Sequence, residues 1–410
     1  MKIEENIIKV LKRGFLCDHC LGRLWSQLLS GFSNEERGKI IRKYIAFLID
    51  SGEKIDVDMS NFYEIKFKNV KIESKKPIEC IVCKNIFQSI DEIAKNTVKK
   101  LKKIEFNNFL VGSTIPDSIL NIEETIWSEI GINYVESIKS EINRELGKKL
   151  GSIIKKPVNF KNPDVLIIAD FKKNNVEIVI NSLYILGYYK KLKRGIPQCK
   201  WGTPGKYKTS VQEIIAKPLM KVTKGISNKF SGSGREDIDA RCLDWRPFVI
   251  EIIKPKIRKI NFRKIEKQIN KSRKVKVKGL KVSNKFTVRR IKSETGDKTY
   301  KALVKFKKPV KKQELKKLKS LIGIISQRTP QRVVHRRADL IRKRSVKDIK
   351  YKQINKKTIE LKIKTTAGLY IKELITGDKG RTKPSVSEVL DNEAIPKNLD
   401  VIKIEKPKNL

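Results

Sequence analysis

The sequence predicts an α+β protein in two parts, with a mixed, largely antiparallel sheet in the C-terminal part. Segments of that part alternate apolar and basic residues at the period of a strand, most clearly KVKVKGLKV over 274–282. In the N-terminal part, apolar residues recur at helical spacing between two Cys-x-x-Cys pairs. A chain of 410 residues is long enough for two or three domains, each with its own core.

The N-terminal part is expected to begin with helices and to end with strands. The opening segment, MKIEENIIKVLKRGF, has the pattern of an amphipathic helix. A second helix is predicted over 34–50, with an apolar face made of Ile40, Ile41, Tyr44, Ile45 and Leu48. Residues 118–150 form another amphipathic helical stretch, and 163–169 and 175–181 are expected to be short buried strands.

The C-terminal part is expected to begin after the Gly- and Pro-containing stretch 195–206. Ser210 followed by Glu213 has the spacing of a helix capping box. Beyond it, 301–310 and 358–366 are strand candidates, with a helix between them over 311–321. This succession fits a catalytic α+β domain in which one face of the sheet carries a cleft.

The chain is strongly basic. It has 93 Lys and Arg against 45 Asp and Glu, a formal net charge of +48, and residues 254–300 hold 18 basic and 3 acidic side chains. Genome bias toward lysine would raise glutamate as well, and glutamate is not raised. The excess predicts binding to a polyanion, for which nucleic acid is the simplest candidate. No apolar run reaches the length of a membrane span and the N-terminus is unlike a signal peptide, so a soluble cytoplasmic protein is expected.

Four cysteines have the spacing of a metal site: Cys17, Cys20, Cys80 and Cys83. Two Cys-x-x-Cys pairs supply four thiolates, the ligand set of a tetrahedral structural Zn²⁺ site. A cytoplasmic location disfavours disulfides, and a thioredoxin-like role lacks its βαβ context. His19, inside the first pair, is interpreted as a bystander. Cys199 and Cys242 are unpaired in the sequence, and packing is the simpler explanation for Cys242, because no base lies beside it.

The segment 231–252, SGSGREDIDARCLDWRPFVIEI, holds the candidate catalytic acid. Asp237 follows glycines and Arg235 and precedes an apolar, β-prone run, so it is predicted to lie on a loop beside a strand. A nearby guanidinium keeps a carboxyl group ionised at neutral pH. The residues alone leave two interpretations open, a reactive carboxylate and an Arg–Asp ion pair that tightens a surface turn.

This segment resembles the catalytic motif of pseudouridine synthases, in which an Asp follows Gly-Arg-x. The chain is most similar to the archaeal and eukaryotic tRNA pseudouridine synthases of the tenth class. Residues 181–201, 327–343 and 367–384 resemble three further motifs of that family, so the resemblance covers most of the chain. It implies isomerisation of uridine to pseudouridine at positions 54 and 55 of the TΨC arm, with tRNA as partner. It also implies no organic cofactor and no obligatory protein partner.

The resemblance implies a division of the chain into two halves. Residues 1–200 would form an RNA-binding half with the zinc module and, over about 60–190, a THUMP domain, a module found on several tRNA-modifying enzymes. Residues 201–410 would form the pseudouridine synthase catalytic domain. Two positions depart from the family pattern. The linker Leu243-Asp244-Trp245 lacks the usual Gly, and Tyr188 stands where an Arg is expected.

By the same resemblance, the catalytic residues are Asp237, which is the nucleophile, Arg235, which precedes it in the motif, and Lys372, the cation that pairs with it. Tyr300 corresponds to the aromatic residue that stacks on the flipped uracil; without the resemblance it would be an ordinary strand residue. Asp239 is the nearest competing acid, and we expect it to face away from Asp237.

The remaining motifs suggest further substrate contacts. Tyr370 and Ile371 correspond to residues that touch the substrate and pack under the base. Arg336 and Arg337 belong to a basic run that grips RNA phosphates. His335, in the same run, is interpreted as a phosphate contact or a packing residue rather than a general base.

Two rival functions remain beside this one. A THUMP methyltransferase or sulfur-transferring ligase would need a Gly-rich methyl-donor loop or a phosphate-binding loop. Gly232-Ser233-Gly234 begins such a loop, but Asp237 stands where the third glycine would be, and no Gly-Lys-Ser/Thr sequence occurs. A non-catalytic tRNA-binding protein of the same fold is opposed by the joint presence of Asp237, Tyr300 and Lys372.

Overall fold

The computed structural model describes residues 3–72, 74–200, 202 and 206–405. The chain divides into two compact units, Met1–Asn181 and Ser182–Leu410. This division precedes the expected boundary at 200/201, because the segment that follows Asn181 forms a strand of the large sheet of the second unit. Trp201, in one of the motifs described above, lies outside the described residues, as does the side chain of Arg336.

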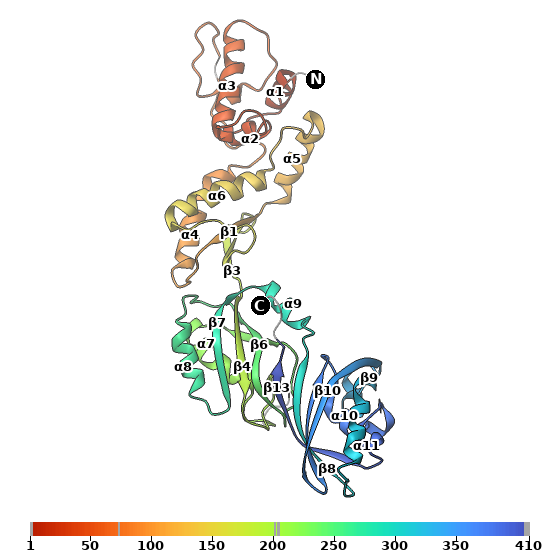
Figure 1. The fold of residues 1–410 in the computed structure, drawn as a ribbon. Coiled ribbons are helices and arrows are strands. Elements are labelled where there is room, and N and C mark those ends of the chain that lie inside the picture. The colour runs from red at the N-terminus through yellow and green to blue at the C-terminus, as the bar shows by residue number, and fades with distance from the viewer. Residues whose placement is uncertain (1–2, 73, 201, 203–205, 406–410) are drawn as a thin grey trace. The chain divides into compact units, whose positions relative to one another are not determined.

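The first unit opens with a helical module that carries the cysteine pairs (Figure 1). Its helices are α1 (Ile3–Leu11), α2 (Asp18–Arg23) and α3 (Asn34–Asp50), followed by the 3-10 helices η1 (Met59–Phe62) and η2 (Ile86–Ser89). The helix predicted over 34–50 is confirmed, and a capping box of Ser33 with Glu36 fixes its start. Its buried face is rotated from the expected one. Ile45 is buried, whereas Ile40 and Tyr44 are about half exposed, because α3 packs on α2 along the face that carries its glycine.

The rest of the first unit is a three-stranded sheet with helices packed on it. Its elements are α4 (Ile90–Leu101), β1 (Phe109–Thr114), α5 (Asp117–Ile130), α6 (Ile138–Ile154), β2 (Val165–Asp170) and β3 (Asn175–Ile180). The order is β1-β2-β3, with β1 parallel and β3 antiparallel to β2. The two strands predicted in this region are therefore confirmed, and alternate residues of β2 are buried against α4 and α6. The stretch 118–150 is two helices, α5 and α6, rather than one.

Helices α2 and α3 cross so closely that only glycine fits at the crossing. A Cβ on Gly22 would lie 1.8 Å from the carbonyl oxygen of Asn34, and a Cβ on Gly38 would lie 2.0 Å from that of Asp18. Non-bonded atoms in a close-packed interior do not approach to such distances. The two glycines therefore set the spacing between α3 and the helix that carries the first cysteine pair.

The second unit is built on a ten-stranded sheet, which is largely antiparallel as predicted. Its strands are β4 (Leu183–Lys191), β5 (Ser227–Gly232), β6 (Arg241–Ile253), β7 (Val275–Ser283), β8 (Lys298–Phe306), β9 (Gly323–Arg328), β10 (Ile341–Asn355), β11 (Thr358–Thr365), β12 (Thr382–Lys383) and β13 (Ala394–Ile404). The order is β12-β9-β10-β11-β8-β13-β6-β4-β7, with β5 beside β6. Among the strand pairs that the structure describes in this sheet, β13 and β6 alone run parallel. The strands predicted over 274–282, 301–310 and 358–366 are β7, β8 and β11.

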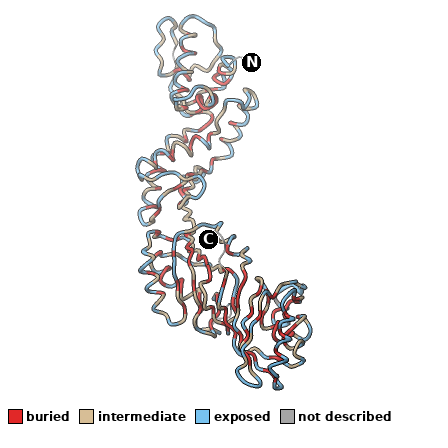
Figure 2. Tube along the Cα trace, in the orientation of Figure 1, coloured by how far each residue is buried: buried red, intermediate tan, exposed pale blue. Residues whose placement is uncertain are grey.

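Helices pack against this sheet and cover two separate cores. They are α7 (Val211–Thr223), α8 (Phe262–Asn270), α9 (Lys285–Lys292), α10 (Ile371–Thr376) and α11 (Val386–Val389), with the 3-10 helices η3 (Glu314–Leu321), η4 (Gln331–Arg336) and η5 (Asp378–Gly380). One core lies between α7, α8 and strands β4, β6 and β7, and the other between α10, η3 and strands β8, β10 and β11. Figure 2 shows the buried residues following the strands of the sheet.

The sequence predicts two features of the helices in the second unit. Ser210 caps α7, accepting from the Glu213 N–H and donating to its carboxylate, as predicted. The helix expected over 311–321 is the 3-10 helix η3. Across the described parts of the chain, no helix has the length and apolar character that crossing a bilayer requires.

Replacing Gly22 with Ala is expected to destabilise the first unit by about 1–3 kcal/mol, because the added methyl group forces α2 and α3 apart. Gly151→Ala is the matched control, since nothing lies within 4 Å of the Cβ position there. Helix propensity predicts that this control gains up to about 1 kcal/mol. Thermal unfolding followed by circular dichroism measures both variants. A Gly22→Ala protein as stable as the control would show that the close crossing does not constrain the unit.

Candidate active site

A cleft of about 820 Å³ lies in the second unit, lined by the loop before β6 and by residues of β6, β8, η4, β10, α10 and β13. Seven of the eight site residues predicted in this unit line it: Arg235, Asp237, Tyr300, Arg337, Tyr370, Ile371 and Lys372. The eighth, Arg336, lies in η4, and its side chain is not described. The cleft thus brings together motifs from four separate parts of the sequence.

Beneath the cleft, a buried network holds the loop that carries Asp237. The buried Glu236 side chain forms an ion pair with Arg246 at 3.2 Å and accepts a hydrogen bond of 3.0 Å from the Tyr189 hydroxyl. Gln198 donates to the Tyr189 oxygen at 2.7 Å. With Glu236 fixed in the interior, the half-exposed side chain of the next residue lines the cleft.

Two further side chains fix the backbone of this loop. Lys191 donates to the carbonyl oxygens of Asp237 and Ile238 at 2.9 and 3.0 Å, and Arg194 donates to that of Asp239 at 2.9 Å. Burial lowers the pKa of the Lys191 ammonium, and the loop carbonyls replace water that it has lost. The backbone of the loop is therefore held by Lys191 of β4 and by Arg194 of the segment that follows it.

Two cations face the Asp237 carboxylate. Arg332 of η4 donates hydrogen bonds of 3.3 and 3.2 Å to its two oxygens, and Lys372 of α10 lies 3.6 Å from it. Arg332 is itself held by Glu373 at 2.6 Å. Arg235 is exposed, and the guanidinium that contacts the acid belongs to Arg332 instead. The sequence showed Arg332 only as one member of a basic run, so its contact with Asp237 was not predicted.

Asp239 lies close to the same lysine as Asp237, so the expectation that it faces away was wrong. Residues two apart in an extended segment lie on the same face, and the loop also turns after Asp237, whose carbonyl accepts a hydrogen bond of 3.0 Å from the Ala240 N–H. Lys372 donates to both Asp239 oxygens at 2.7 Å, nearer than it lies to Asp237. Burial raises the pKa of Asp239, but the hydrogen bond from Lys372 and the positive charges of Lys372 and Arg332 together outweigh burial and leave that pKa below its usual value.

Tyr300 and Tyr370 present two aromatic rings to the cleft. Burial raises the pKa of the Tyr300 hydroxyl to about 12, so it stays protonated at neutral pH. The guanidinium carbons of Arg332 and Arg337 lie 5.9 and 6.0 Å from the centre of the Tyr370 ring. Gln327 fixes the Tyr370 backbone, accepting from its N–H at 2.8 Å and donating to its carbonyl at 3.1 Å. The lining of the cleft thus includes two aromatic side chains, a residue type on which nucleic-acid bases stack with a gain of roughly 1–3 kcal/mol.

In the first unit, four Sγ atoms lie within 4.8 Å of one another, those of Cys17, Cys20, Cys80 and Cys83. A tetrahedral Zn²⁺ with bonds of about 2.3 Å to sulfur needs Sγ atoms roughly 3.8 Å apart, and those of Cys17 and Cys83 are 3.6 Å apart. The Cys17 N–H donates to the Cys80 sulfur at 3.3 Å. The cluster fits a metal ion held by four thiolates. Cys242 is buried in the second unit, as its packing role predicts.

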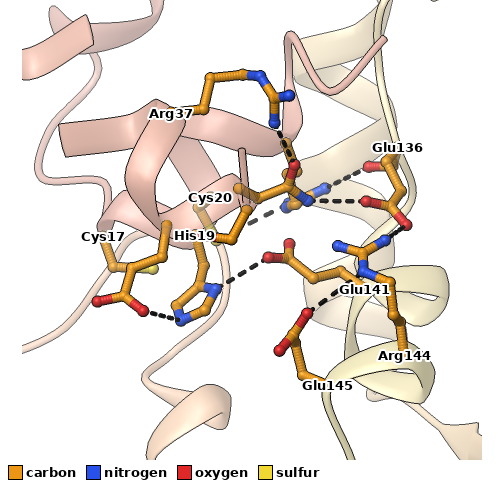
Figure 3. A network of polar contacts seen from close by, with 12 residues as sticks. Cys17, His19, Cys20, Arg37, Glu136, Glu141, Arg144 and Glu145 are labelled. Carbon is orange, nitrogen blue, oxygen red and sulfur yellow. Dashed lines mark hydrogen bonds and ion pairs between the residues drawn. The ribbon is translucent and has the colours of Figure 1, made fainter. Parts of the chain in front are cut away.

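His19 contacts acids and is not part of the cysteine cluster, as predicted (Figure 3). Its Nδ1 lies 2.9 Å from Glu141 of α6, and its Nε2 lies 3.7 Å from Glu35 of α3. In the same network, Asn34 donates to Glu136, just before α6, at 2.8 Å. These contacts join the cysteine-bearing module to the helices of the first unit's sheet.

Two family models match the chain. The one described as "Pus10, C-terminal" matches residues 184–405, and the one described as "Pus10 THUMP domain, archaeal" matches residues 93–170. The first match begins at residue 184, within β4. This start agrees with a boundary between the two units after Asn181. The second lies inside the segment in which a THUMP domain was expected.

Curated proteins named tRNA pseudouridine synthase Pus10 are similar to this chain over most of its length. The one from Pyrococcus furiosus is 40% identical over 98% of this chain and 98% of its own length. The one from Methanocaldococcus jannaschii is 39% identical over 97% of this chain and 93% of its own length.

Among solved structures, the crystal structure of a Cbf5-Nop10-Gar1 complex is 17% identical over 53% of this chain and 48% of its own, with a TM-score of 0.32. A crystal structure of pseudouridylate synthase is 15% identical over 57% of this chain and 70% of its own, with a TM-score of 0.24. TM-scores this low support no conclusion about this chain. Since the relatives and the two family models together span nearly all of its residues, the chain belongs to the Pus10 family.

Proposed function

We propose that this chain converts uridine to pseudouridine in tRNA, at positions 54 and 55 of the TΨC arm, with Asp237 as the nucleophile. The observation that carries the proposal is the position of Asp237 in a cleft with Tyr300 and Lys372, in a chain of the Pus10 family. The rival hypothesis, a tRNA-binding protein without this activity, is not favoured, because the relatives are named as synthases.

The reaction requires little from the protein other than one positioned acid. The C1′–N1 bond breaks, the uracil rotates, and C5 joins C1′, so the reaction needs neither an oxidant nor an energy source. Asp237 supplies the nucleophilic oxygen, and Arg332 and Lys372 hold its oxygens in place. An acid fixed in this way does not have to be oriented when the nucleotide arrives.

The target uridine must leave its stack to reach Asp237, which costs a few kcal/mol. Stacking on Tyr300 offsets part of that cost. Arg337 lines the cleft and is exposed, which suits it to a phosphate. The net charge of +48 and the THUMP match support tRNA as the partner. We also propose that the protein acts in the cytoplasm and without an obligatory protein partner.

Replacing Asp237 with Asn is expected to abolish pseudouridine formation, because the amide keeps the shape of the side chain but is not a nucleophile. Asp239→Asn is the matched control. It frees Lys372 to pair with Asp237, so its rate should stay within about tenfold of the wild type, the size of one exposed ion pair. Pseudouridine is mapped in an unmodified tRNA transcript, and tRNA binding, which both variants should retain, is measured alongside.

Three outcomes would contradict the proposal. An active Asp237→Asn protein beside an inactive Asp239→Asn protein would identify Asp239 as the nucleophile. Activity in both variants would place the chemistry elsewhere. A folded wild type that binds tRNA but forms no pseudouridine would overturn the function itself.

We also propose that the ion held by the four cysteines is Zn²⁺ with a structural role. Four thiolates are a common set of ligands for structural zinc, and they leave no open position for a substrate. The ion would join the start of α2, with Cys17 and Cys20, to the distant loop of Cys80 and Cys83.

One zinc per chain is expected when the purified protein is examined by elemental analysis. Cys17→Ser should lower both the zinc content and the melting temperature, because it removes one of four ligands from an ion that supports the fold. Cys199→Ser is the control, since this cysteine is outside the cluster. Wild-type protein without zinc at neutral pH, or a Cys17→Ser variant as stable as the control, would count against the proposal.

A further inference from the structure

Lys298 is a buried lysine in the cleft that the chemistry above does not use. It is the first residue of β8, is 7% exposed, and lines the cleft. Tyr300 lies two residues further along the strand, so the two side chains are on the same side of it. At about 3.3 Å per residue, the two positions are roughly 6.6 Å apart, which is about the width of a base.

The Lys298 ammonium has no hydrogen bond or ion pair with any other residue that the structure describes. A cation lies close to it instead. Lys298 Nζ and Arg246 Nη1 are each 3.1 Å from the place that a Cβ on Gly234 would occupy. Arg246 is paired with Glu236, whereas Lys298 is left without a counter-charge at the wall of the cleft.

Burial, reinforced by repulsion from Arg246, lowers the pKa of Lys298 to about 8, so the side chain is mostly cationic at neutral pH. Two groups oppose the shift, Cys242 on β6 and Glu294 before β8. The register partners of Lys298 on β11 and β13 are Thr365 and Ile404, which carry no charge. An unpaired buried ammonium is costly, which favours an acceptor arriving with the substrate.

We propose that Lys298 donates a hydrogen bond to a carbonyl oxygen of the target uracil and stabilises the negative charge on the base when the C1′–N1 bond breaks. The electron pair of that bond stays with the base and is delocalised onto its oxygens. It is given up when C5 joins C1′, after which C5 loses its proton and N1 gains one. Lys298 keeps its own proton throughout. The inference rests on the proposed function.

A backbone phosphate is the other anion that an RNA could bring to Lys298. The base of a flipped nucleotide enters its pocket while the phosphates stay with the strand outside. Arg337 is exposed and suited to the strand, whereas Lys298 is buried and neighbours Tyr300, the residue proposed to stack on the base. Its depth and its neighbour therefore favour an oxygen of the base.

Lys298→Met tests this role, because methionine has a similar length and no charge. Lys301→Met is the matched control, since Lys301 is an exposed residue of the same strand that pairs with Glu360 at 2.6 Å. The rate of pseudouridine formation is measured under single turnover at saturating tRNA, and the Kd for tRNA is measured separately. Lys298→Met should lower the rate about 100-fold, as loss of one oxyanion donor does, with the Kd unchanged.

The pH dependence gives a second readout that a merely structural role would not change. In the wild type, the second-order rate at low tRNA should fall above about pH 8, as Lys298 loses its proton. This alkaline limb should be absent from Lys298→Met and present in Lys301→Met.

A weaker Kd with an unchanged saturating rate would show a phosphate contact and overturn the proposal, and so would an unchanged rate and pH profile. If Lys298→Met does not fold, Lys298→Gln replaces it, because the amide keeps a polar side chain at this buried position and removes the charge. Its saturating rate should fall, and a wild-type rate would overturn the proposal. Failure of the wild type and of Lys301→Met to form any pseudouridine would count against the proposed function instead.

Discussion

The candidate active site depends on the buried ion pair between Glu236 and Arg246. Taking two charges out of water costs several kcal/mol per ion unless other polar groups replace the water. Here the Tyr189 hydroxyl donates to Glu236, and Arg246 donates to the Ser233 carbonyl at 2.6 Å. Because the acid directly before Asp237 is fixed in the interior, the direction of the loop is fixed as well, and the carboxylate of Asp237 lines the cleft.

Around the Asp237 carboxylate, acidic and basic side chains alternate. Arg332 bridges Asp237 and Glu373, while Lys372 lies between Asp237 and Asp239. Lys372 and Glu373 are consecutive residues of α10, so one turn of this short helix supplies both a cation and an acid to the group of charges. Asp237 shares each of its cations with a second acid, and neither cation is committed to it alone. This sharing leaves room for the carboxylate to exchange a protein contact for one with substrate.

Local pattern was sufficient to predict features whose information lies within a few residues. Alternation predicted β7, the spacing of Ser210 and Glu213 predicted the cap of α7, and two Cys-x-x-Cys pairs predicted the sulfur cluster. Contacts between distant segments could not be predicted in this way. Arg332 is 95 residues from Asp237, and nothing in its own surroundings distinguishes it from the arginines beside it.

The features that differ from expectation depend on tertiary geometry. Ile40 is exposed because the crossing of α2 and α3 selects another face of the helix. Asp239 lies beside Lys372, as Asp237 does, because the two residues share one side of the chain and the loop turns after Asp237. The unit boundary precedes the glycine- and proline-containing stretch because β4 is paired on both sides within the second sheet.

The rate of pseudouridine formation by Glu236→Gln at saturating tRNA tests most directly whether the buried pair positions Asp237. The amide can keep the hydrogen bond to Tyr189 but leaves Arg246 buried without a counter-charge, a change that costs roughly 3–5 kcal/mol of stability. Measured below the unfolding temperature of the variant, the rate should fall about 100-fold through misplacement of the acid, with tRNA binding retained. A folded Glu236→Gln protein that works at the wild-type rate would contradict this role.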